Sequence, residues 1–117
     1  MKALGRHLLA EFSGCDRERL ADLDFIRNHM LAAAQACGAT VITHSFHHFA
    51  PLGVSGVVII SESHLAIHTW PEHSFAAVDL FTCGERVSPE RAVETLQMAF
   101  RSDPPAVRLL ERGLLGT

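Results

Sequence analysis

The stretch SGVVIISESHLAIHTWPEHSFAAVDLFTCG, residues 55–84, holds three apolar segments separated by short polar breaks. Residues 55–62 and 75–84 are apolar runs of the kind that form buried strands. Between them, residues 64–70 alternate in character, with Val, Ile and Thr common in the surroundings. The alternation predicts a third strand with two different faces. One face carries His64, Ala66, His68 and Trp70, and the other carries Leu65, Ile67 and Thr69.

The segments outside this stretch predict further strands. We expect strands over residues 2–12, 40–49 and 106–110, although a helix competes for the first of them. No linker, repeat or low-complexity segment interrupts the chain, so we expect one domain over residues 1–117. Strands in series with only two helices favour an α+β fold, a two-layer sandwich in which a mostly antiparallel β-sheet carries both helices on one face.

Two helices are expected from their start and stop signals. Asp22 or Asp24 can cap a helix that runs to Cys37, where Gly38 is placed to end it. The apolar residues of this helix recur at intervals of three and four: Phe25, Ile26, Met30, Ala33 and Cys37. Ser88 as cap and Pro89 as first residue open a second helix. It runs to about Phe100, with a buried stripe of Ala92, Val93, Leu96 and Phe100.

Composition excludes several classes of protein. The chain has 117 residues, 48% of them hydrophobic, and a net charge of −3 without a basic run, which gives no electrostatic case for nucleic acid. No apolar stretch approaches the ~20 residues of a membrane span. The three cysteines are odd in number and lack a CxxC pair, which suits a reducing cytoplasm better than a disulfide framework.

The histidines do not favour a metal site. His64 and His68 match the ends of H-E-x-x-H, but that motif needs a helix, and a strand separates them by about 13 Å. The cluster of His44, His47 and His48 has no carboxylate or thiolate nearby in sequence. We therefore expect no metal, and polar positions along strand faces are the simpler interpretation of these residues.

A serine hydrolase is also disfavoured. A nucleophilic serine commonly sits at a G-x-S-x-G elbow, whereas Ser63 is flanked by Glu62 and His64. Ser55, in GVSG, has only part of that pattern.

The whole stretch resembles the small prokaryotic S-adenosylmethionine decarboxylases, which are pyruvoyl-dependent and self-cleaving. The combination ESHLAIHTWPE (62–72) followed by DLFTCG (79–84) carries the resemblance, and KALGRHLLAEF (2–12) extends it. The tail beyond Gly84 matches less clearly.

The resemblance implies that the proenzyme cleaves itself between Glu62 and Ser63, into chains 1–62 and 63–117. The Ser63 hydroxyl attacks the Glu62 carbonyl, and elimination then leaves a pyruvoyl group at position 63. This ketone forms a Schiff base with the substrate amine and accepts the charge left by departing carbon dioxide. His68 is implied to move protons during cleavage if the hairpin folds suitably, with Ser55 assisting.

The other site residues also follow from the resemblance. Cys83 matches the acid that protonates the decarboxylated substrate, while Cys15 and Cys37 have no such context. Phe49 matches an adenine-stacking residue and Glu72 a ribose-binding one. Trp70 and Leu65 are expected in the same substrate pocket.

The resemblance predicts a cytoplasmic enzyme that supplies decarboxylated S-adenosylmethionine as the aminopropyl donor for spermidine synthesis. It also implies a homodimer of cleaved protomers, with the pocket near the subunit interface. Two alternatives stay open: the same machinery acting on a basic amino acid such as ornithine or arginine, and a non-processing regulatory or binding paralogue.

Overall fold

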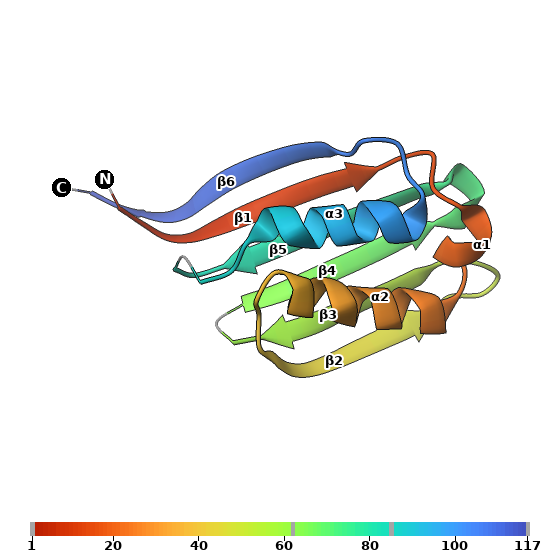
Figure 1. The fold of residues 1–117 in the computed structure, drawn as a ribbon, viewed down its shortest axis with the longest axis horizontal. Coiled ribbons are helices and arrows are strands. Elements are labelled where there is room, and N and C mark those ends of the chain that lie inside the picture. Colours follow the sequence, from red (N-terminus) through yellow and green to blue (C-terminus); the bar gives the residue numbers. More distant parts are fainter. Residues whose placement is uncertain (1, 62, 85, 117) are drawn as a thin grey trace.

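The computed structural model describes residues 2–61, 63–84 and 86–116. Within these residues all strands join one six-stranded antiparallel sheet, in the order β2-β3-β4-β5-β1-β6. Helices α2 and α3 lie side by side on one face of it (Figure 1). The expected α+β sandwich is confirmed. The strands are β1 (Lys2–Phe12), β2 (Val41–His48), β3 (Val54–Ile60), β4 (Ser63–Trp70), β5 (Phe75–Thr82) and β6 (Ala106–Leu115).

The two long helices begin close to their predicted starts. For α2 (Leu23–Ala36), the Asp22 side chain accepts a hydrogen bond from the Phe25 N–H at 3.1 Å. For α3 (Pro89–Phe100), Ser88 holds the cap position, but its hydroxyl donates to the Glu90 carboxylate instead of accepting a backbone N–H. The helix therefore starts where predicted, but the Ser88 side chain does not make the capping hydrogen bond that a serine cap was expected to make.

Three features differ from the sequence-based expectations. The short elements α1 (Arg17–Leu20) and η1 (Pro71–His73) were not predicted, because segments of three or four residues carry too little periodicity. Strand β6 continues to Leu115, five residues beyond its expected end. It forms an edge of the sheet and is exposed along its whole length, so neither of its faces shows the burial pattern of a core strand.

The alternation predicted for the central strand β4 is confirmed. Leu65, Ile67 and Thr69 are buried toward the helices, and the residues between them lie partly exposed on the other face. We call the helix-free side of the sheet the open face. None of the helices in residues 2–61, 63–84 and 86–116 has the length and apolar character needed to cross a membrane.

Thr69 ties three elements together beneath the helices. Its hydroxyl oxygen accepts the Val54 N–H of β3 at 2.9 Å, and the hydroxyl donates to the Leu20 carbonyl at the end of α1, also at 2.9 Å. The side chain is only 1% exposed. Both hydrogen bonds are thus shielded from water, and neither backbone group has solvent as a replacement partner.

Thr69→Val should lower the free energy of unfolding by about 1–3 kcal/mol, because it leaves two buried backbone groups unpaired. Urea denaturation measures the difference. Thr43→Val is the control: it makes the same chemical change at an exposed position of β2 and should shift stability by no more than about 0.5 kcal/mol. Equal stability of Thr69→Val and the unaltered chain would contradict the assignment.

Candidate active site

The predicted site residues fall into two groups at opposite ends of β4. Ser63 begins the strand, and His68 lies five residues further along it. At ~3.3 Å per residue the two are about 16 Å apart, and their side chains point to opposite faces of the sheet. The hairpin therefore does not bring His68 back to Ser63 within one chain, and that part of the sequence-based expectation is wrong.

The first group, which we call the cleavage end, is built around Ser63. Ile60 of β3 pairs with Ser63, so residues 61 and 62 connect the two strands; Glu62 itself lies outside the described residues. On the other side, Ser63 pairs with Thr82, the last residue of β5, and Cys83 follows directly. Cys83 and Ser61 line the same small pocket. The backbone thus places the predicted proton donor close to the predicted cleavage position.

The second group, the aromatic end, gathers around His68. Its ring Nδ1 is hydrogen-bonded to the hydroxyl of Ser55, the residue that faces it on β3. The ring centroid lies 4.3 Å from that of Trp70 and 6.0 Å from that of Phe49. These three rings and Glu72 line one pocket. Four of the residues predicted to assist processing or bind substrate therefore meet here, with Ser55 behind His68.

Phe49 is held at this pocket by its own loop. The Phe49 N–H donates to the Gly53 carbonyl at 2.8 Å, which closes the connection between β2 and β3. Gly53 has φ +104°, a conformation that favours glycine, and a side chain there would approach the Thr69 carbonyl.

Leu65 does not belong to either group. It is 0% exposed and packs in the core beneath the helices. The expectation that it contacts substrate is corrected: its place on the helix-facing side of β4 makes it a core residue. His44, His47 and His48 lie exposed on the edge strand β2, where the His47 ring packs against Phe49.

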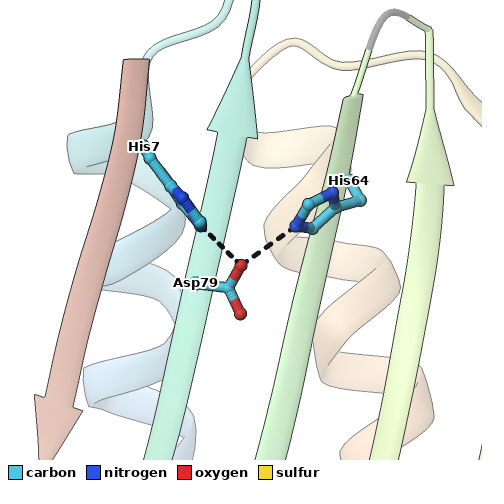
Figure 2. A group of neighbouring side chains, drawn as sticks. All are labelled: His7, His64 and Asp79. Carbon is cyan, nitrogen blue, oxygen red and sulfur yellow. Dashed lines mark hydrogen bonds and ion pairs between the residues drawn. The ribbon is translucent and has the colours of Figure 1, made fainter. Parts of the chain in front are cut away.

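A third cluster on the open face was missed by sequence reasoning. Asp79 of β5 accepts hydrogen bonds on Oδ2 from His7 Nε2 at 2.8 Å and from His64 Nε2 at 3.0 Å (Figure 2). The three residues come from neighbouring strands, and their positions in the sequence give no sign that they meet. Only the pairing of β1, β5 and β4 reveals the cluster.

The protonation of His7 decides what this cluster does. The three residues offer ligand atoms within 4.8 Å of one another, a donor set that suits a transition metal. However, Arg112 donates to His7 Nδ1 at 3.0 Å, and a guanidinium can only donate. The His7 ring therefore carries its proton on Nε2 and donates it in the hydrogen bond to Asp79. The arrangement is a hydrogen-bond network that holds the His64 ring, next to Ser63.

The three thiols differ in accessibility. Burial, with a smaller contribution from Asp103, raises the pKa of the Cys15 thiol to about 11. Burial also raises the pKa of the Cys37 thiol. Both donate to backbone carbonyls inside the fold, whereas Cys83 is partly exposed beside the cleavage end. Cys83 is therefore the most accessible of the three thiols.

Comparisons with known proteins identify relatives of this chain. The sequence model of the S-adenosylmethionine decarboxylase family matches residues 6–113. The chain is 59% identical to the S-adenosylmethionine decarboxylase proenzyme of Fervidobacterium nodosum, over 87% of this chain and 74% of the relative. It is 57% identical to the proenzyme of Thermotoga maritima, over 97% and 87%.

A solved structure shows the same fold. The crystal structure of the adenosylmethionine decarboxylase from Aquifex aeolicus superposes with a TM-score of 0.90 at 33% identity, covering 99% of this chain and 96% of that one. The chain belongs to the S-adenosylmethionine decarboxylase family. The family and the class of enzyme predicted from residues 55–84 are confirmed, and the match continues through α3 and β6, beyond the segments that suggested it.

Iodoacetamide at pH 8 should modify Cys83 well before the other two thiols in the native protein. With a pKa of about 11, roughly one Cys15 thiol in a thousand is ionised at pH 8, and only the thiolate reacts. Reactivity of Cys15 should rise as the pH approaches 11. Peptide mass mapping measures each site, and all three should react in urea. Native-state labelling of Cys15 or Cys37 as fast as Cys83 would contradict the structure.

Proposed function

We propose that this chain is a proenzyme that cleaves itself before Ser63, converts that serine into a pyruvoyl group and decarboxylates S-adenosylmethionine. The observation that carries the proposal is the position of Ser63. It stands at the first residue of a central strand, directly after a short connection, with a buried hydroxyl that has no partner among the described residues. The relatives named as proenzymes support the same interpretation.

The cleavage chemistry needs only groups of the chain and water. The Ser63 oxygen attacks the carbonyl carbon of residue 62, the bond to the Ser63 nitrogen breaks, and the hydroxyl proton ends on that nitrogen. Loss of the Ser63 α-proton then expels a carboxylate from the resulting ester. Hydrolysis of the remaining enamine, through its imine tautomer, releases ammonia. Only a residue with a β-hydroxyl or thiol allows one atom to act first as nucleophile and then as leaving group.

The residues around the two ends fit a pyruvoyl group and its substrate. A pyruvoyl group supplies the carbonyl that withdraws electrons from the bond to the departing carbon dioxide. Cys83 would return a proton to the carbon that loses the carboxylate. At the aromatic end, Phe49 and Trp70 offer flat surfaces to an adenine and to a sulfonium cation, while Glu72 can accept hydrogen bonds from ribose hydroxyls. Such a pocket favours the nucleoside over ornithine or arginine, which need no aromatic platform.

We further propose that two chains share each active site. The cleavage end and the aromatic end of one chain are about 16 Å apart along β4, too far to act on one substrate atom. A partner related by a twofold axis, with the two open faces in contact, would set the aromatic end of one chain against the open-face side of the cleavage end of the other. There His68 would reach the main chain at Ser63, whose side chain points to the helix side. An isologous interface does this twice, giving two sites per dimer. The small size of the chain also favours self-association.

The product would serve as the aminopropyl donor for spermidine synthesis in the cytoplasm. The three free thiols of the described fold are consistent with a reducing compartment. Ser63, His68 and Cys83 are all present in this chain, which argues against a paralogue that no longer processes.

A denaturing mass spectrum tests the cleavage directly. We expect two fragments, residues 1–62 and 63–117, the second beginning with a keto group in place of an amine. Ser63→Ala should remain one polypeptide and release no carbon dioxide from carboxyl-labelled S-adenosylmethionine. An active preparation consisting of intact chains would rule the proposal out, and release from labelled ornithine or arginine alone would redirect it.

Mixing two inactive variants tests the shared site. Ser63→Ala cannot be cleaved but retains its aromatic end, while His68→Ala retains Ser63 but lacks the histidine. When the two are co-expressed, His68→Ala chains should be cleaved in mixed dimers, and they should remain intact when expressed alone. The two chains differ in mass, so one spectrum follows both. Persistent lack of cleavage in mixtures that contain verified heterodimers would place His68 and Ser63 in the same chain's site, against the proposal.

A further inference from the structure

Two hydroxyls without partners face each other at the cleavage end. Ser63 of β4 and Thr82 of β5 are directly paired across the sheet, and both side chains lie on the helix-facing side. Ser63 Oγ and Thr82 Oγ1 are both buried, and neither has a hydrogen-bond partner in the described residues. Thr82 is 2% exposed. The hydroxyl of Thr82, which can donate or accept a hydrogen bond, is thus buried next to Ser63, the residue that the proposed cleavage converts.

Packing does not explain the hydroxyl of Thr82. In the described part of the chain, Thr69 and Thr82 are the two buried polar residues. The hydroxyl of Thr69 makes two hydrogen bonds to backbone groups and has a structural role. The hydroxyl of Thr82 makes none to the residues that the structure describes, and valine would fill the same volume without burying such a polar atom. A residue that costs stability in this way, next to a reacting group, is a candidate for function.

Thr82 is also within reach of Ser63. Directly opposite residues on neighbouring antiparallel strands have Cβ atoms about 4.5–5.5 Å apart, so rotation about χ1 brings two hydroxyls into hydrogen-bond contact. The neighbouring His64 ring lies on the open face and is hydrogen-bonded to Asp79, as Figure 2 shows. Thr82 is therefore positioned to contact the Ser63 hydroxyl from the helix side.

We propose that Thr82 is a positioning residue for self-cleavage: its hydroxyl oxygen accepts the hydrogen bond of the Ser63 hydroxyl and so directs a lone pair of Ser63 Oγ at the carbonyl carbon of residue 62. This inference rests on the proposed self-cleavage. Thr82 itself gains and loses no atoms. The Oγ–C bond forms, the C–N bond breaks, and the Ser63 hydroxyl proton passes to the Ser63 nitrogen.

Two matched pairs of side chains at position 82 test this role. Thr and Val have nearly the same shape and differ by the hydroxyl, and so do Ser and Ala. The proenzymes are made by cell-free translation, and intact and cleaved chains are followed by denaturing mass spectrometry over time. We expect Thr82→Val to be cleaved at least about tenfold more slowly than the unaltered chain, the effect of losing one orienting hydrogen bond. Thr82→Ser should stay within about threefold of it, and Thr82→Ala should be slow like Val.

Thermal stability separates positioning from a structural role. In the Ser63→Ala chain, which stays uncleaved, adding Thr82→Val should leave the unfolding temperature the same or raise it, because the only further change is the loss of a buried hydroxyl without a described partner. A structural hydroxyl would give the opposite sign, as we expect for Thr69→Val. If Val does not fold, the Ser and Ala variants still differ by one hydroxyl and carry the test.

The outcomes distinguish failure of the proposed role of Thr82 from failure of the proposed self-cleavage. If the unaltered chain is never cleaved before Ser63, the proposed function fails. If the unaltered chain is cleaved and Thr82→Val or Thr82→Ala keeps its rate, the role of Thr82 is wrong while the function stands. If a folded Thr82→Ser variant is cleaved no faster than Thr82→Ala, the role of Thr82 is also overturned.

Discussion

The pairing of β4 with its two neighbours is the constraint on which the rest of the site depends. Its hydrogen bonds to β3 place Ser55 against His68, and its hydrogen bonds to β5 place Ser63 against Thr82. A slip of one residue would turn every side chain of β4 to the other face and separate both pairs. The buried residues on the helix-facing side, such as Leu65 and Ile67, make that slip costly, since each buries an apolar side chain worth about 1.5–3 kcal/mol. Core packing thereby sets the register on which the proposed chemistry relies.

Much of the fold could be predicted because its signals are local. Alternation along residues 64–70 gave the two faces of β4, and Asp22 and Pro89 marked the starts of the long helices. The misses have a physical cause as well. Short elements such as α1 gain their stability from tertiary contacts and not from their own sequence, so no local pattern marks them. Ser88 has a different, local cause: its hydroxyl donates to the carboxylate of Glu90, two residues away, and accepts no helix N–H.

The candidate residues could be named from the family resemblance, but their arrangement could not. Ser63 and Cys83 lie at one end of the candidate site and Phe49 and Glu72 at the other, a distribution that depends on strand length and register. Leu65 was misassigned because a motif does not state which face of a strand a residue occupies. His7 and Asp79 were missed because they are 72 residues apart and meet only through the β1–β5 pairing. Sequence reveals which chemical groups are present, and the sheet decides which of them meet.

The separation of the two ends also restricts how a second chain could complete the site. In the proposed dimer the twofold axis must pass near the middle of β4, between Ser63 and His68, because only then does each end face the other end of the partner. Ala66 lies at that midpoint on the open face and Ala77 lies opposite His68, and together they form part of a shallow hollow. Small side chains at the crossing let two sheets approach to the usual spacing of about 10 Å. A larger residue at position 66 would hold the two sheets apart. Both active sites of the dimer would then lose the contact between their two ends, although neither site contains residue 66.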